Sequence, residues 1–265
     1  MNLIKKYWVI LAIFAGVFPL YGERVVSLSP AVTELVIFAG GRAQLCGRSS
    51  ACDLPETACL PVAGDLGKPF PEAVLRNRAT MVISDVAHPG ANWQLLQRCR
   101  VKVKLLENRS IDDLPRNVRQ IGKVLALPDA DLRAAELADK VACLKRTCPS
   151  QLYPAVVILG VSPLISCGGK TFISSALELA GIKNIAAGAG EKYFIMDPEF
   201  LCTAEVDVLI FIGVSPAAAE ELLKKASFRH LYNCRRIFLD RNKWSRLTPA
   251  TIEAVISLKN ELVRQ

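Results

Sequence analysis

Histidine is scarce in this sequence, which has only His88 and His230 among its 265 residues. Proteins that hold bare zinc or manganese usually use several histidines together with carboxylates, so the composition argues against direct metal binding. The nine cysteines also show none of the spacings that are typical of zinc sites. We therefore predict neither a metal centre nor a resident cofactor.

The sequence also lacks an N-terminal apolar run long enough to cross a bilayer, which takes about 20 residues as a helix. The run at residues 7–18 follows Lys5-Lys6 and leads to a small-residue exit at Tyr21-Gly22. This pattern is typical of a secretory signal peptide, and we predict one over residues 1–22. Leu20 lies before the expected cleavage site, at a position where signal peptides usually have a small residue. Retention of residues 1–22 as an uncleaved anchor is therefore the alternative.

Aromatic residues make up only 7% of the chain, and they are not interleaved with the scattered lysines and arginines. A groove for nucleic acid normally combines both, so we predict no nucleic-acid partner. Loss of residues 1–22 removes two lysines and no acids, which lowers the formal charge from +8 to +6. The exported chain remains basic, and a basic cleft mouth that attracts an anionic ligand is one interpretation of that charge.

Catalytic motifs are absent as well, because the chain has no Gly-x-Ser-x-Gly elbow and its histidines have no evident nucleophile partner. Residues 167–171 resemble the tail of a phosphate-binding loop, but Leu164 stands where that motif begins with glycine. We interpret the glycines as a turn before a helix that starts near Phe172. The prediction is a protein that is not an enzyme and has no catalytic residues.

Cysteine is abundant for an exported chain, and the odd total leaves at least one thiol without an intramolecular partner. Cys46, Cys52 and Cys59 lie in a stretch that we expect to be irregular, while Cys143 and Cys148 flank the end of an expected helix. A disulfide in either place would brace the chain. The pairing stays open at this point.

One pattern occurs twice. Phe70-Pro71-Glu72 precedes an apolar run at residues 80–84, and Asp197-Pro198-Glu199 precedes another at residues 207–211. In each copy Pro-Glu is expected to open a short helix, and a strand follows after the same interval. The repeat predicts two similar lobes that enclose a ligand.

Strand and helix patterns alternate in both halves, which predicts an α/β fold with a mostly parallel sheet and flanking helices in each lobe. We expect an N-terminal lobe at residues 23–110, connecting helices at 111–150 and a C-terminal lobe at 151–265. The second connecting helix, with Asp129 as its cap, would run about eighteen residues or roughly 27 Å. A rigid helix of that length predicts little hinge motion.

The mature chain resembles the periplasmic binding proteins that serve ABC importers of iron-siderophores, haem and cobalamin, with the cobalamin-binding branch most similar. Five segments carry the resemblance: residues 24–34, Pro71-Glu72 with its strand, residues 169–185, Pro198-Glu199 with its strand, and Trp244-x-Arg246-x-x-Pro249. The chain departs from the cobalamin pattern at Asn242-Lys243-Trp244, where an Asp-Trp-Phe-like stretch is usual, and at Leu66, which is often aromatic.

The resemblance implies a periplasmic monomer that carries a corrinoid or a ferric chelate to an inner-membrane ABC permease. By position, Glu72 and Glu199 would dock onto arginines of the permease. Ligand contacts are expected on loops at the carboxyl ends of the strands. These candidates are Ser29, Asp65, Leu66, Asp85, His88, Tyr193, Phe194, Asn242, Trp244 and Arg246.

Three alternatives remain. A haem ligand could use His88 or Tyr193 as an axial ligand. A metal-ion binding protein of the same fold and an exported chelatase-like enzyme are the other two. For Trp244, burial against the last helix is as good an interpretation as ligand contact.

Overall fold

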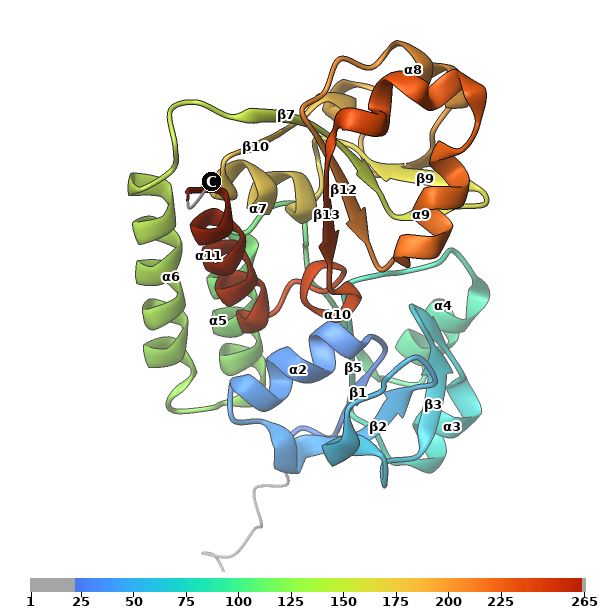
Figure 1. The fold of residues 1–265 in the computed structure, drawn as a ribbon. Coiled ribbons are helices and arrows are strands. Elements are labelled where there is room, and N and C mark those ends of the chain that lie inside the picture. Colours follow the sequence, from blue (N-terminus) through green and yellow to red (C-terminus); the bar gives the residue numbers. More distant parts are fainter. Residues whose placement is uncertain (1–21, 264–265) are drawn as a thin grey trace, which may run out of the picture.

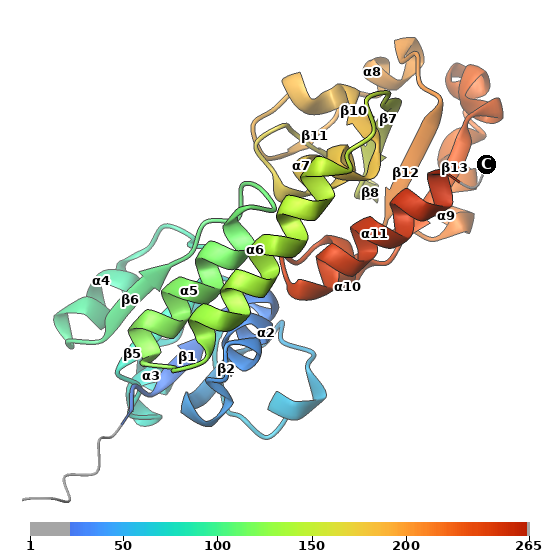
Figure 2. The ribbon, with the colours of Figure 1, turned by 90° about the vertical axis from the view of Figure 1, so that its left-hand side faces the viewer.

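The computed structural model describes residues 22–263 and shows two lobes, one above the other, with helices along one side (Figures 1 and 2). The signal peptide predicted for residues 1–22 lies almost wholly outside the described residues. Among the helices of residues 22–263, none has the length and apolar character that a membrane span requires.

The N-terminal lobe is built on a six-stranded sheet in the order β4-β3-β2-β1-β5-β6. Its strands are β1 (Val25–Ser27), β2 (Leu45–Ser49), β3 (Val62–Asp65), β4 (Lys68–Pro69), β5 (Met81–Ser84) and β6 (Lys102–Leu105). All neighbouring pairs are parallel except β3 and β4. Helices α2 (Pro30–Phe38), α3 (Pro71–Arg76) and α4 (Ala91–Arg98) flank this sheet.

Both faces of this sheet are covered. Val25 and Val26 are fully buried, and Val25 belongs to the core cluster that includes α2, whereas Val26 belongs to the cluster that includes α3 and α4. Side chains of successive strand residues point to opposite faces, so the Val-Val pair supplies one residue to each layer. The carboxyl ends of the strands are thereby left as the edge that meets the other lobe.

The C-terminal lobe contains a parallel sheet in the order β10-β7-β12-β13 and a small antiparallel sheet in the order β11-β9-β8. The strands are β7 (Tyr153–Ile158), β8 (Gly160–Val161), β9 (Leu164–Cys167), β10 (Ile182–Asn184), β11 (Tyr193–Ile195), β12 (Val208–Ile212) and β13 (Arg235–Leu239). The helices are α7 (Phe172–Ala180), α8 (Pro198–Thr203), α9 (Pro216–Leu223), α10 (Arg241–Trp244) and α11 (Pro249–Val263). The α/β class and the two-lobed plan are confirmed.

Two antiparallel helices, α5 (Asp113–Leu125) and α6 (Ala130–Arg146), join the lobes and run beside both of them (Figure 2). The backbone N–H of Ile111, just before α5, donates to Ser175 Oγ of α7 at 3.3 Å. One hydrophobic cluster includes Val25 of the first sheet, Leu114 of α5 and Val157 of the second sheet. The lobes therefore share a continuous core through the connecting helices.

The predicted repeat is confirmed as local structure. Glu72 is the second residue of α3 and Glu199 is the second residue of α8. From Glu72 to the start of β5 at residue 81 is nine positions, and from Glu199 to the start of β12 at residue 208 is also nine. Both copies thus place a short helix and its glutamate at the same point before a buried strand.

Two local expectations were wrong. The stretch from Cys46 to Cys59 was expected to be irregular, but Cys46 lies in the strand β2, in which Leu45, Gly47 and Ser49 are the buried residues. Asp129 was expected to cap α6, but its side chain accepts no hydrogen bond from that helix in the described structure. Its backbone has φ −92° and ψ −1°, whereas a capping residue normally has extended backbone. All nine cysteines are free thiols in residues 22–263.

Candidate functional site

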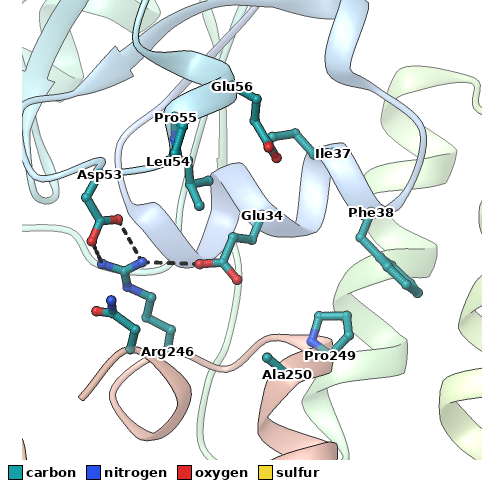
Figure 3. A pocket seen from close by; sticks show the side chains of 11 residues that line it. Glu34, Ile37, Phe38, Asp53, Leu54, Pro55, Glu56, Arg246, Pro249 and Ala250 are labelled. Carbon is teal, nitrogen blue, oxygen red and sulfur yellow. Dashed lines mark hydrogen bonds and ion pairs between the residues drawn. The ribbon is translucent and has the colours of Figure 1, made fainter. Parts of the chain in front are cut away.

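A pocket of about 540 Å³ lies between the lobes, with walls from both of them (Figure 3). The N-terminal lobe contributes one face of α2 and the segment that follows β2. The C-terminal lobe contributes α10, the loop after it and the first turn of α11. The lining residues are Glu34, Ile37, Phe38, Asp53, Leu54, Pro55, Glu56, Asn242, Arg246, Pro249 and Ala250.

Arg246 joins the two walls of this pocket. Its Nη1 lies 3.2 Å from Glu34 Oε1 and 2.8 Å from Asp53 Oδ1, and its Nη2 donates to Asp53 Oδ2 at 2.9 Å. The contact with Asp53 is therefore bidentate, the geometry in which a guanidinium binds a carboxylate most strongly. Only 14% of the Arg246 side chain is exposed. The ion pairs hold the C-terminal lobe against α2 and the Asp53 segment.

The loop that carries Arg246 is fixed by its own hydrogen bonds. Asp240 caps α10 by accepting from the backbone N–H of Lys243 at 3.0 Å. Thr251 Oγ1 donates to the Arg246 carbonyl at 2.7 Å and accepts from the Thr248 N–H at 3.1 Å. Trp244 is 2% exposed and belongs to the hydrophobic core. The guanidinium is thus positioned by a rigid turn.

The two carboxylates beside Arg246 have shifted pKa values in opposite directions. Burial raises the pKa of Glu34, and the hydrogen bond from Arg246 offsets only part of that effect. The hydrogen bond from Arg246 lowers the pKa of Asp53, which is more exposed. Glu34 is therefore the partner that loses more of its hydration in the folded protein.

A second group of candidates gathers at the carboxyl ends of the N-terminal strands. Asp85 follows β5, and Asn108 Nδ2 donates to its Oδ2 at 2.6 Å. The other oxygen, Oδ1, is buried and has no hydrogen-bond partner among the described residues. Burial raises the pKa of Asp85, since the charged form loses hydration. Hydrogen bonds from the side chains of Ser29 and Asn108 offset part of this effect.

The turn at residues 65–67 packs against the loop that follows β5. Gly67 has φ +63°, and a Cβ there would come within 2.7 Å of the Val86 carbonyl oxygen, so glycine is required. The Gly67 carbonyl accepts from the His88 N–H at 3.1 Å. Ser50 Oγ donates to Asp65 Oδ1 at 2.5 Å, and Leu66 is 41% exposed. The structure therefore brings Asp65, Leu66 and His88 together.

Comparison with known proteins identifies the family of this chain. The sequence model of the family described as periplasmic binding protein matches residues 25–232. The chain belongs to the periplasmic binding protein family. A vitamin B12-binding protein of Pectobacterium carotovorum is 26% identical over 201 residues, which cover 73% of this chain and 72% of that protein.

Solved structures show the same fold. The periplasmic vitamin B12-binding protein of Vibrio cholerae superimposes with a TM-score of 0.78 at 21% identity, over 90% of this chain and 96% of that chain. A periplasmic haem-binding protein from Roseiflexus superimposes with a TM-score of 0.75 at 23% identity, over 90% of this chain and 97% of that chain. The two-lobed architecture is thus that of the family.

In the C-terminal lobe of this periplasmic binding protein, Tyr193 is the first residue of β11 and is 53% exposed. Partial burial raises the pKa of the Tyr193 hydroxyl, and the negative charges of Cys167 and Asp85 raise it further. Its role as a ligand contact stays a prediction.

The remaining candidates have different surroundings. Phe194 packs against the second core cluster, and Asn242 lines the pocket. Ser29 is 2% exposed, and its Oγ caps α2 by accepting from the Val32 N–H at 3.1 Å. Trp244 has the packing role described above. Ligand contact stays a prediction for every candidate residue.

Three partners were missed by the sequence reasoning. Glu34 and Asp53 hold Arg246, and Trp93 Nε1 donates to the His88 carbonyl at 3.2 Å. Glu34 is the last residue of the first segment that carries the family resemblance. The sequence therefore drew attention to this residue but not to its ion pair with Arg246. Within residues 22–263 no cluster of three or more histidine, cysteine or acidic side chains is arranged to hold a metal ion.

Glu72 and Glu199 are both exposed, and their helices α3 and α8 lie at opposite ends of the molecule (Figure 1). Within the described part of the chain, neither carboxylate forms an ion pair. Asp197 accepts from the Glu199 N–H at 2.9 Å and so caps α8. Both glutamates are therefore accessible to a partner.

The raised pKa of Asp85 predicts a pH-dependent effect of the substitution Asp85→Asn. Below the ordinary aspartate pKa both folded and unfolded states are protonated, so the carboxyl gives no difference. As the pH rises from the ordinary aspartate pKa to the higher folded-state pKa, the unfolded state ionises first and the wild-type fold loses stability, and above the folded-state pKa the penalty is complete. We expect the variant to gain about 1 kcal/mol over wild type between about pH 4 and about pH 7. Urea unfolding at both pH values measures this, and a difference that does not change with pH would contradict it.

Proposed function

We propose that this protein is an exported solute receptor that binds a corrinoid between its lobes and delivers it to an ABC permease of the inner membrane. No bond in the ligand is made or broken. Residues 1–22 serve as the signal peptide, and the receptor works in the periplasm as a monomer.

The observation that carries this proposal is the interlobe pocket around Arg246. Its walls come from α2 and the Asp53 segment on one side and from the α10–α11 region on the other. A small molecule held there contacts both lobes at once, which is how a two-lobed receptor gains affinity without chemistry. Apolar lining from Ile37, Phe38, Leu54, Pro55 and Pro249 suits a large organic ligand.

The choice of a corrinoid draws on the curated relatives. Vitamin B12-binding proteins of Pectobacterium and of Vibrio parahaemolyticus align over about three quarters of this chain at 24–26% identity. Solved structures of the same fold include vitamin B12-binding and haem-binding proteins. The sequence relatives favour the corrinoid, whereas the fold is compatible with both ligands.

Haem is the second candidate, because solved structures of the same fold include haem-binding proteins. Tyr193 is 53% exposed, and a tyrosine hydroxyl is one of the protein groups that can ligate a haem iron. His88 lies in the exposed loop beside Gly67 and is the other candidate axial ligand. A ferric siderophore would need neither residue as a ligand.

Titration of the purified protein with cyanocobalamin, haemin and a ferric siderophore tests the proposal. Trp93 is a suitable fluorescent reporter, because its indole N–H donates to the carbonyl of His88, one of the candidate ligand residues. We expect saturable quenching by cyanocobalamin at one equivalent. Quenching by haemin alone would favour the haem function instead.

The same sample separates a receptor from a chelatase-like enzyme. After incubation and release by denaturation, a receptor returns its ligand with an unchanged mass and absorption spectrum. Loss or insertion of the central metal ion, detected by mass spectrometry, would identify an enzyme and contradict the proposal. Heat-denatured protein serves as the control for chemistry that does not need the fold.

A further inference from the structure

We propose that the end of the N-terminal lobe formed by the amino ends of β1, β5 and β6 binds the surface of a membrane that contains anionic phospholipids. This end lies opposite the carboxyl ends of the strands, which meet the other lobe. The inference goes beyond the proposed function and does not depend on which ligand the receptor carries. The surface, named the basic face, consists of Arg24, Arg76, Arg78, Arg98, Arg100 and Lys102 together with Glu23, and none of these residues lines the interlobe pocket.

A short sequence is repeated at the ends of two neighbouring helices. Arg76-Asn77-Arg78 ends α3 and Arg98-Cys99-Arg100 ends α4, and each Arg-x-Arg leads within three residues into a strand. Those strands, β5 and β6, are parallel, and Met81 pairs with Lys102 at their starts. Helix α3 also packs beside α4 on the same face of the sheet (Figure 1). The two Arg-x-Arg segments therefore lie side by side.

The strand β1 extends this edge on the other side of β5. Val25 pairs with Met81, so Arg24 lies beside the start of β5. The Arg24 guanidinium donates to the Asn77 carbonyl at 2.9 Å and to the Arg78 carbonyl at 3.2 Å. These contacts satisfy carbonyl groups at the C-terminal end of α3, which have no partner within the helix. Arg24 thus fixes the turn that carries Arg78.

The second arginine of each repeat has a left-handed backbone. Arg78 has φ +51° and Arg100 has φ +61°. Glycine is usual at such positions after a helix, because a side chain destabilises the left-handed conformation. The helix dipole favours Arg76 and Arg98, since cations stabilise the last turn of a helix. It does not explain why residues 78 and 100 are arginines rather than glycines, so these two charges point to a function.

The positive charges of the basic face are largely uncompensated. The four arginines of the two repeats are exposed, and none of them forms an ion pair within residues 22–263. Lys102 is the one member that pairs with Glu23. From residue 76 to residue 104 the chain has six lysines and arginines and one acid, Asp85, which follows β5 at the opposite end of the strand. This end of the lobe therefore attracts anions.

A membrane surface fits the basic face better than a single small anion does. The starts of three neighbouring strands extend over about 10 Å, so the arginines match several phosphate groups side by side. A guanidinium binds phosphate oxygens in a bidentate manner, and every arginine close to an anionic bilayer adds to the attraction. Leu75 and Leu95 are 42% and 46% exposed on the same two helices. Apolar side chains beside basic ones are typical of surfaces that lie in a membrane interface.

Helix α3 connects the basic face to the glutamate proposed for permease docking. Glu72 precedes Arg76 by four residues, which corresponds to about one helical turn or roughly 6 Å. A receptor docked through Glu72 would present Arg76 beside the permease, where the lipid surface begins. The two contacts use different residues of one helix, so substitutions can separate them.

Replacement of Arg78 and Arg100 together by glycine tests the inference. Glycine suits both left-handed positions, so the free energy of unfolding should stay equal or rise while both charges are lost. We expect the exported protein to cosediment with vesicles of equimolar phosphatidylglycerol and phosphatidylcholine, but not with vesicles of phosphatidylcholine alone. The glycine variant should bind the mixed vesicles about thirtyfold more weakly at low salt. High salt should weaken binding of the wild type.

Two control variants separate the basic face from net charge. Lys224→Gln with Arg229→Gln removes the same charge from exposed residues of the C-terminal lobe and should bind within about twofold of wild type. Arg78→Lys with Arg100→Lys keeps the charge and should retain most of the binding.

Equal binding of the wild type to both kinds of vesicle, or equal weakening in the glycine variant and the C-terminal control, would overturn the inference. Binding to soluble polyglutamate but not to vesicles would assign the basic face to an acidic protein partner and overturn it as well. Cyanocobalamin titration of the glycine variant should match that of wild type. Failure of the proposed function would therefore appear in that titration and not in the vesicle assay.

Discussion

Replacement of Glu72 and Glu199 together by lysine should reduce cellular uptake of the ligand to background while its affinity for the purified protein stays within about twofold of wild type. Both side chains are exposed at opposite ends of the molecule and outside the pocket. If they dock onto arginines of the permease, charge reversal converts two attractive contacts into repulsive ones. Uptake of labelled ligand by cells that express only the variant measures the effect.

A matched control replaces two other exposed glutamates, Glu136 and Glu205, by lysine. This control introduces the same change in net charge at positions outside α3 and α8, so uptake should remain near wild type. Normal uptake by the Glu72 and Glu199 variant would exclude the docking role. Loss of ligand affinity in that variant would instead assign the glutamates to the binding site.

Replacement of Arg246 by methionine should lower the free energy of unfolding by about 2–3 kcal/mol. The substitution keeps much of the side-chain volume but leaves Glu34 partly buried without its cation, and it removes the link between α2 and the α10–α11 turn. Urea denaturation followed by circular dichroism gives the change. The double variant Glu34→Gln with Arg246→Met should recover part of the loss, because no buried charge then remains.

The exposed pair Lys140–Glu253 provides the comparison, since it also links distant parts of the chain, with side chains 55% and 64% exposed. Lys140→Met should cost less than about 1 kcal/mol. If the two methionine variants lose equal stability, the Arg246 contacts contribute no more than a surface pair and the lobes are held by the hydrophobic core alone.

Continuous apolar runs made the central strands predictable. Strands were expected in the apolar runs at residues 80–84 and 207–211, and the structure has β5 at Met81–Ser84 and β12 at Val208–Ile212, in which all residues are buried. The strands that were missed are short or contain small residues, such as β2 and the three strands of the antiparallel sheet. Their register depends on neighbouring strands, which a local sequence pattern does not describe.

The site was less predictable than the fold. Arg246 was identified from the Trp244-x-Arg246-x-x-Pro249 pattern, yet its partners are 212 and 193 residues away in the sequence. Trp244 stands in the same motif and is buried in the core. The motif identifies the segment that contains a site residue. It does not tell which of its side chains points into the pocket and which into the core, because that depends on the backbone of α10 and the packing around it.

The continuous core that joins the two sheets through α5 and α6 has a consequence for how a transporter would sense this receptor. If the lobes barely separate, the spacing between Glu72 and Glu199 is nearly the same in the empty and the loaded protein. A permease that contacts only those two carboxylates then cannot distinguish the empty from the loaded protein by their spacing. The permease would have to distinguish the two states at the opening between the lobes, where a bound ligand changes the surface that the permease contacts.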